Sequence, residues 1–268
     1  MLVKMFATCL IMILLSSKAH SQYLSWGEIE KKCKSEGINT KALGHIQCFF
    51  EKHEKSIFQK KIPTGAGGVE VIDRCDNGST LSVNLPKVFA LVDYTVPSDQ
   101  RRMFLVNRET GNITAMAVAH GRYDAGLLNT HLSYNKNSIR DAVYFSNEID
   151  SNAPSSGFFI AGLEYLGKFG RSLILHGLEE GINDNACERA VVIHKYTLMG
   201  RSKAHSMSSG CLMVDKDYIN ETINLLEGKS DIVKEGTLEK GGGLVFVYGP
   251  RESKWKNNTC EGQFSVQL

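Results

Sequence analysis

Short apolar runs separated by turns fill the chain from residue 88 to residue 249, and they restrict its fold more than any other feature. The runs are 88–92, 102–107, 113–119, 157–161, 172–176, 190–194 and 244–248. Short apolar runs bounded by glycine-containing or polar turns are typical of buried strands, and the turn at 108–112 predicts a β-hairpin. Only residues 217–226 in this region have apolar side chains at helical spacing. The sequence therefore predicts a mostly β domain with few helices.

The first part of the chain has a different pattern, which predicts helices over residues 22–60. The segment WGEIEKKCKSEG has apolar residues at helical spacing and ends at Gly37, and residues 40–59 repeat that period. A glycine-rich segment follows, which indicates a linker. We expect a helical segment and linker at 22–78, the β domain at 79–250 and a polar tail at 251–268.

Residues 1–21 have the pattern of a cleaved secretory signal. Lys4 precedes the apolar run 5–15, and small residues stand near Ser21. The run is too short to span a bilayer, although a retained anchor is the alternative. We expect a mature protein that starts at Gln22 and works outside the cytoplasm, in the periplasm, the cell wall or the extracellular space.

The charge of the mature chain argues against several classes of partner. Removal of residues 1–21 takes away Lys4 and Lys18 and no acid, so the formal charge of +2 becomes zero. A neutral chain has no general attraction for nucleic acid or acidic membranes. No second stretch is apolar enough to cross a membrane. We therefore expect no nucleic-acid partner and no integral membrane segment after signal cleavage. We also expect a monomer.

The cysteines leave several pairings open. Six remain after the signal: Cys33, Cys48, Cys75, Cys187, Cys211 and Cys260. In an oxidising compartment an even count favours disulfides. Cys33 with Cys48 and Cys75 with Cys260 are two reasonable pairs, which leave Cys187 over. Connectivity does not follow from the sequence alone.

Cys211 stands in the segment SMSSGCLMVD and is either a disulfide partner or a nucleophile. Gly210 allows a sharp backbone turn and leaves room for a substrate. Ser208 and Ser209 can hydrogen-bond to nearby main chain and fix the loop. A thiol needs activation to act as a nucleophile, and a neighbouring histidine is the usual means.

Three of the histidines before Cys211 are candidates to activate it. His194 ends the apolar run 190–194, where alternation along a strand puts it on the same side as Val192. A rigid strand end suits a general base. His176 ends another strand and could line the same cleft, whereas His205 lies in a loop. These histidines with Cys211 could instead bind zinc, but their spacing matches no compact zinc motif.

Two stretches together resemble a known family. Residues 176–196, HGLEEGINDNACERAVVIHKY, and 200–215, GRSKAHSMSSGCLMVD, are similar to the murein L,D-transpeptidase catalytic domain, a YkuD-like family, and in particular to its secreted branch. That pattern has an apolar strand ending in histidine, followed by Ser-x-Gly-Cys, and here His194 and Cys211 are 17 positions apart. Residues 91–122 resemble the opening strands of the family. The resemblance covers about residues 80–250.

The resemblance implies a fold, a reaction and a site. The fold would be an L,D-transpeptidase-like β-sandwich or barrel, and the partner would be the peptide stem of peptidoglycan. The product would be a crosslink, or a shortened stem if water replaces the acceptor amine in an L,D-carboxypeptidase. No metal or organic cofactor is required. The implied catalytic residues are Cys211, His194 and Gly210, and the implied substrate-binding residues are Ser208, Ser209, His176 and His205.

Three positions depart from the family pattern and keep a further alternative open. Lys195 replaces the usual glycine after the histidine, Ser209 replaces a common histidine or tryptophan, and Met213 replaces a common arginine or asparagine. These departures would also fit a non-catalytic module that binds cell wall. A papain-like protease is disfavoured because its cysteine precedes its histidine in the chain.

Overall fold

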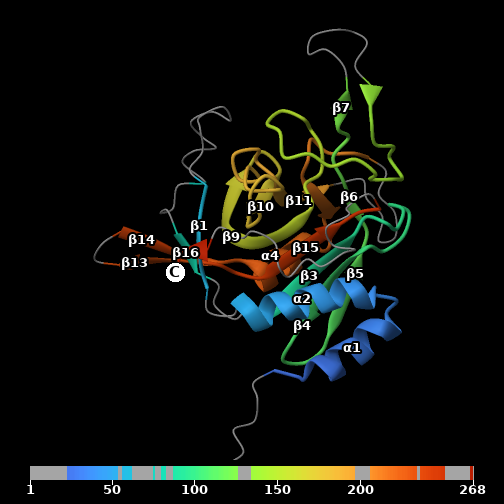
Figure 1. The fold of residues 1–268 in the computed structure, drawn as a ribbon. Coiled ribbons are helices and arrows are strands. Elements are labelled where there is room, and N and C mark those ends of the chain that lie inside the picture. The colour runs from blue at the N-terminus through green and yellow to red at the C-terminus, as the bar shows by residue number, and fades with distance from the viewer. Residues whose placement is uncertain are drawn as a thin grey trace, which may run out of the picture.

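The computed structural model describes residues 23–53, 56–61, 75, 80–82, 87–125, 134–196, 206–233, 236–250 and 266–267 (Figure 1). The helices are α1 (Trp26–Ser35), α2 (Thr40–His53) and α4 (Ile219–Leu226). The strands are β1 (Ile57–Gln59), β2 (Thr80–Ser82), β3 (Val88–Asp93), β4 (Met103–Asn107), β5 (Ile113–Met116), β6 (Val118–Ala119), β7 (Asp124–Ala125), β8 (Tyr134–Asn135), β9 (Gly157–Gly167), β10 (Gly170–Gly177), β11 (Val192–Tyr196), β12 (Leu212–Asp215), β13 (Lys229–Val233), β14 (Gly236–Lys240), β15 (Leu244–Tyr248) and β16 (Val266–Gln267). Strands exceed helices, as the sequence predicts.

The main sheet is nearly closed into a barrel. Its strand order is β5-β4-β3-β15-β9-β10-β11-β12-β6. β5, at one edge, ends at Met116, and β6, at the other edge, begins at Val118, so only Ala117 separates the two edges along the chain. A sheet whose edges are joined by one residue must curl round on itself. The predicted barrel-like fold and the β4–β5 hairpin are both confirmed.

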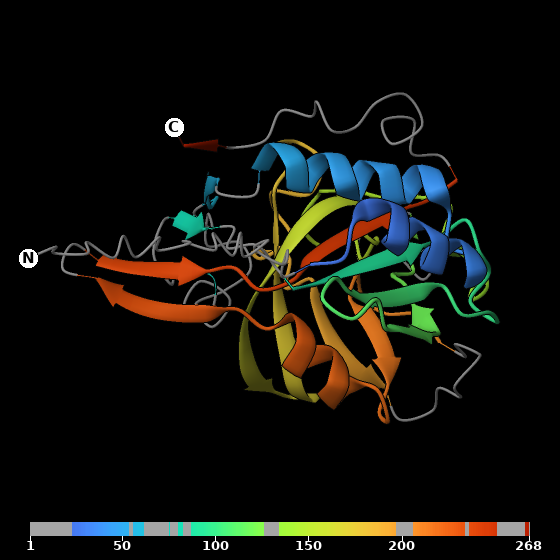
Figure 2. The same ribbon diagram turned by 90° about the horizontal axis from the view of Figure 1, so that it is seen from below.

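The central strands are buried on both faces, which explains their continuous apolar sequence. In β3, Val88 and Ala90 point into the barrel core, which α4 completes with Ile219 and Ile223. The alternate residue Phe89 points outwards, into a second core shared with α1 and α2. Figures 1 and 2 show these two helices side by side against the outer face of the sheet.

The N-terminal helices begin and end where local chemistry dictates. The side chain of Ser25 accepts from the main-chain N–H of Glu28, whose carboxylate accepts from Ser25 in return, so α1 starts with a capping box. Gly37, with a φ of +77°, lies just after this helix. The predicted helix from residue 40 was too long, however. It ends at His53, and residues 57–59 form β1 because they pair with β2 and β16 from distant parts of the chain.

A second sheet, with the order β13-β14-β2-β1-β16, lies beside the barrel. Its β13–β14 hairpin projects away from the barrel in both views (Figures 1 and 2). Strands β1, β2, β13, β14 and β16 were not predicted. Three of them have only two or three residues, too few to show a period in the sequence.

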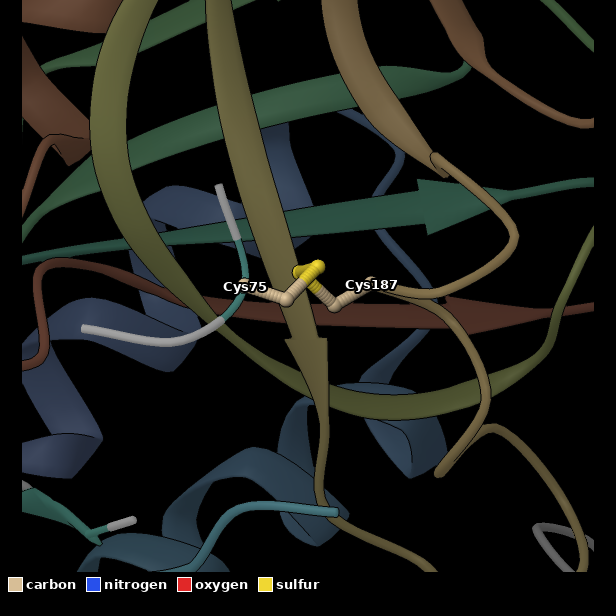
Figure 3. The surroundings of a disulfide bond; sticks show 2 residues. All are labelled: Cys75 and Cys187. Carbon is tan, nitrogen blue, oxygen red and sulfur yellow. A yellow bond between two sulfur atoms is a disulfide. The ribbon is translucent and has the colours of Figure 1, made fainter. Parts of the chain in front are cut away.

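The observed disulfide differs from both predicted pairs. Cys75 is bonded to Cys187, with their Cα atoms 5.8 Å apart, and Figure 3 shows the two side chains meeting beside the sheet. Cys33 is a free thiol buried among apolar side chains under α1, where burial raises its pKa to about 12. Cys48 is also disulfide-bonded. The predicted signal (1–21), Cys260 and His205 lie outside the described residues.

Within the described part of the chain, we find no helix that is both long enough and apolar enough to span a bilayer.

Candidate active site

The loop that carries Cys211 is held in one shape by its own hydrogen bonds. Gly210 has a φ of +115°, which L-residues with side chains rarely adopt. Its N–H donates to Ser208 Oγ at 3.1 Å, and that hydroxyl donates to the carbonyl of Cys211 at 2.6 Å. A Cβ atom at position 210 would lie 3.0 Å from the carbonyl oxygen of Ala153. The glycine and the serine therefore fix the direction from which the cysteine projects.

Cys211 itself is a half-buried thiol that takes part in no disulfide. Its Sγ donates to the carbonyl oxygen of Ala190 at 3.2 Å. Ala190 precedes β11, which runs parallel to β12, and in that register Cys211 lies level with Val192. His194 is two residues further along the same face, about 7 Å of strand away. The alternative in which Cys211 is a disulfide partner is contradicted.

His194 is buried and oriented on β11. As predicted, Val191 and Ile193 point into the barrel core, while Val192 and His194 face the opposite side. Nδ1 of His194 lies 2.9 Å from the carbonyl oxygen of Lys195, so Nδ1 carries the hydrogen and Nε2 has a lone pair that can accept a proton.

The surroundings of His194 favour its neutral form. The ring of Phe169, at the tip of the β9–β10 hairpin, stacks on the imidazole with centroids 4.2 Å apart and planes 11° apart. Burial is the main cause that lowers the pKa of His194, and the charge of Lys168 lowers it further, against the Lys195 carbonyl, which raises it. A neutral imidazole at physiological pH is able to accept a proton.

Both side chains line a single cleft of about 500 Å³. Aromatic side chains from the β9–β10 hairpin and β11 form part of its wall. Three cations, Arg122, Lys168 and Arg189, also line it, and among the described lining residues none is acidic. Such a cleft is suited to a ligand that carries negative charge.

The part of the chain that forms this cleft belongs to a known family. Residues 69–234, more than half of the chain, match the family model of the L,D-transpeptidase catalytic domain. The chain belongs to the L,D-transpeptidase family. Among solved structures it is similar to the helical cell shape determining protein Pgp2 from Campylobacter jejuni, with 10% identity and a TM-score of 0.33. That alignment covers 62% of this chain and 48% of Pgp2, so the match spans about half the length of that protein. No curated protein matches the chain.

The L,D-transpeptidase fold brings together most of the residues predicted from the sequence. Ser208 and Ser209 line the cleft with Cys211 and His194. His176 does not join them, because it points from β10 into a separate small hollow beside β1. In the described ranges, no cluster of three or more histidine, cysteine or acidic side chains could hold a metal ion.

Behind the cysteine loop of this family member is a buried polar cluster. The guanidinium of Arg102 donates twice to the Val118 carbonyl, at 2.9 and 2.7 Å, and to His120 Nδ1 at 2.7 Å. His120 Nε2 therefore donates to the Ser138 carbonyl at 2.9 Å. Burial and the Arg102 charge lower the pKa of His120 to about 3, so it stays neutral. The main-chain carbonyl of His120 accepts from the N–H of Ser208, which anchors the loop.

Residues 183–186, Asn-Asp-Asn-Ala, lie in the turn before β11, within the stretch that resembles the family. The side chain of Asn183 is fully buried and donates to the carbonyls of Ser156 and Phe158 at 2.8 and 3.0 Å. The side-chain amide of Asn185 donates to the carbonyl of Asn147 at 2.9 Å, and the main-chain N–H of Asn185 donates to Asn147 Oδ1 at 3.1 Å. These bonds tie the turn before β11 to the start of β9.

Several cleft residues were missed from the sequence, among them three that contact the predicted site or its loop. Phe169 covers His194, Arg122 donates to Ser209 Oγ at 2.9 Å, and Arg189 approaches the cysteine loop. For Arg189 a signal existed, because a cation directly before a buried strand must be placed at the end of that strand. No local pattern points to Phe169 or Arg122.

Proposed function

We propose that this chain is a secreted, cysteine-dependent L,D-transpeptidase that acts on tetrapeptide stems of peptidoglycan. The observation that carries the proposal is the shared cleft, onto which the reduced thiol of Cys211 and the imidazole of His194 both open. Family membership supports peptidoglycan as the substrate. The Cys75–Cys187 disulfide supports an oxidising compartment, in line with the signal predicted at residues 1–21.

The first step would transfer the proton of Cys211 to Nε2 of His194. In the structure the thiol donates to the Ala190 carbonyl, so the side chain must rotate towards the imidazole when substrate binds. The Lys195 carbonyl keeps the hydrogen on Nδ1 and stabilises the imidazolium that forms. The thiolate would then attack the carbonyl carbon of the third residue of the stem.

The next steps would form and resolve a thioester. Main-chain N–H groups at Gly210 and Cys211 are the candidates to hold the oxyanion, a contribution of about 3–4 kcal/mol per donor in acyl transfer. The Gly210 N–H would first have to leave Ser208 Oγ. His194 returns its proton to the amine of the fourth residue, which leaves. An amine from a second stem then attacks the thioester and gives a crosslink, whereas water would give L,D-carboxypeptidase activity.

The charge of the cleft supports a stem as the ligand. A tetrapeptide ends in a free carboxylate, and Arg122, Lys168 and Arg189 line the cleft. The Arg122 side chain is partly neutralised by Asp124 at 2.7 Å, while its Nη1 reaches Ser209 in the cysteine loop. The stem carboxylate would thus meet a net positive wall.

Incubation of the purified protein with disaccharide-tetrapeptide, followed by mass spectrometry, tests the proposal. Crosslinked dimers support the transpeptidase. Loss of the fourth residue without dimers would replace it with the carboxypeptidase, which uses the same side chains. The matched control is Cys211→Ala, which should abolish either product. If wild type and Cys211→Ala are equally inert while both bind peptidoglycan, the chain is a non-catalytic wall-binding module.

A further inference from the structure

Arg189 is a cation fixed beside the cysteine loop by neutral partners. Its Nη1 donates to the Ser146 carbonyl at 2.7 Å and to Ser155 Oγ. Its Nη2 donates to the Ala153 carbonyl at 2.7 Å and to Ser151 Oγ at 3.1 Å. None of these four acceptors carries a charge, so they hold the guanidinium in place without neutralising it. The carboxylate of Glu148 is the acid whose charge also acts on Arg189.

The guanidinium lies on the cysteine side of the cleft. A Cβ atom at Gly210 would be 3.7 Å from its Nη2. Ala190, the residue directly after Arg189, accepts the hydrogen bond from Cys211 Sγ through its carbonyl. Nε of Arg189 is buried and has no hydrogen-bond partner among the residues that the structure describes. Burial lowers the pKa of Arg189 to about 10, against the charge of Cys211, which raises it, so the guanidinium stays protonated at neutral pH.

The histidine side of the cleft offers the thiolate little stabilisation. Burial and Lys168 disfavour the imidazolium form of His194. His194 is therefore suited to take a proton briefly, but not to sustain a thiolate–imidazolium pair. An ordinary cysteine is only a small fraction thiolate at neutral pH, and an adjacent permanent cation increases that fraction.

We propose that Arg189 is a positioning residue whose fixed positive charge stabilises the thiolate of Cys211. This inference rests on the proposed function only in taking Cys211 as the nucleophile. The alternative is that Arg189 merely ties the Ser146–Ser156 segment to the turn before β11. That role would depend on its hydrogen bonds and not on its charge, so two substitutions separate the roles.

Arg189→Gln removes the charge and keeps an amide that can still donate. Arg189→Lys keeps the charge and loses the planar fork of donors. The measurement is the rate at which iodoacetamide alkylates Cys211 in the intact, oxidised chain as a function of pH, followed by peptide mass spectrometry. Cys33, whose burial raises its pKa to about 12, is scored on its own peptide. Thermal melting by circular dichroism verifies that each variant is folded.

We expect the alkylation midpoint of Arg189→Gln to lie about one pH unit or more above that of wild type, and that of Arg189→Lys within a few tenths. An unchanged midpoint in Arg189→Gln, or an equal shift in both variants, overturns the proposal. If Arg189→Gln does not fold, Arg189→Lys decides alone. An upward shift of its alkylation midpoint by about one pH unit, although the charge is kept, contradicts the inference. A midpoint equal to that of wild type supports it.

The readout is independent of peptidoglycan. A chain that leaves the tetrapeptide intact fails the proposed function, yet its thiol still titrates and can still support the role of Arg189. If the enzyme is active and Arg189→Gln has the wild-type midpoint, the role of Arg189 is refuted and the proposed function stands.

Discussion

Replacing Gly210 with alanine tests whether the shape of its loop controls the nucleophile. The φ of +115° would cost an L-residue about 1–3 kcal/mol. The added Cβ would lie 3.0 Å from the Ala153 carbonyl oxygen, so that carbonyl or the loop must move by a few tenths of an ångström. We therefore expect the free energy of unfolding to fall by about 2–3 kcal/mol and Cys211 to be displaced. A displacement of about 1 Å can lower a rate about 100-fold, so a shift of a few tenths of an ångström should lower kcat/KM by a smaller factor, up to about 10-fold.

Gly37→Ala is the matched control. Gly37 has a φ of +77°, and no atom lies within 4 Å of its would-be Cβ, so the substitution adds backbone strain without a steric contact, just after α1. We expect a loss of about 1–2 kcal/mol in urea unfolding and unchanged kcat/KM on disaccharide-tetrapeptide. Full activity in Gly210→Ala, or an equal loss of activity in Gly37→Ala, would refute the link between loop geometry and catalysis.

Two further predictions concern the stacked ring and the disulfide. Phe169→Ala should admit water to His194 and raise the pKa of His194 towards its ordinary value. Because the base must be neutral, the acidic limb of the kcat/KM profile then moves to higher pH. Leu166, on the same hairpin, is 83% exposed, so the control Leu166→Ala should leave the pH profile unchanged. An unmoved limb in Phe169→Ala counts against the stacking argument. The double variant Cys75→Ser, Cys187→Ser opens a loop with a sequence separation of 112 and should lose about 2–5 kcal/mol in urea unfolding. A loss below about 1 kcal/mol would contradict this estimate.

The parts of the site that follow from local physics could be predicted from the sequence. Alternation along residues 191–194 places Ile193 in the barrel core and His194 in the cleft, as the period of a strand requires. Gly210 could be predicted because a turn before a projecting cysteine requires a backbone that other residues avoid. In both cases the cause lies within a few residues of the effect.

The remaining features depend on pairing between distant segments. β1 forms because residues 57–59 meet β2 and β16, so helical period alone extended α2 too far. The β9–β10 hairpin continues to Gly167 through residues that are only partly buried, and no apolar run marks that extension. Phe169 therefore reaches His194 through a register that only the folded sheet defines. The Cys75–Cys187 bond is likewise set by the fold and not by spacing.

Two departures from the family pattern leave the groups around Cys211 and His194 unaltered. Lys195 contributes only its main-chain carbonyl to His194, which glycine would supply equally well. The side chain of Met213 is buried in a small apolar cluster with Ala117 and Ala119, where it lines the cleft beside the imidazole. Neither residue replaces a group that must accept, donate or hold a proton.

Ser209 differs from these two because its side chain holds a cation, Arg122, at the rim of the cleft. A hydroxyl at this position accepts from Arg122 Nη1 at 2.9 Å, and Asp124 holds the Nε of the same guanidinium at 2.7 Å. A histidine or tryptophan ring is larger than this hydroxyl, and the tryptophan ring offers no acceptor at all, so it could not hold the guanidinium in this way. The serine therefore links a cation to the loop that carries Cys211 without touching the thiol. It follows that Ser209 alters the rim of the cleft, where a ligand enters, and leaves the positions of Cys211 and His194 as the family pattern has them.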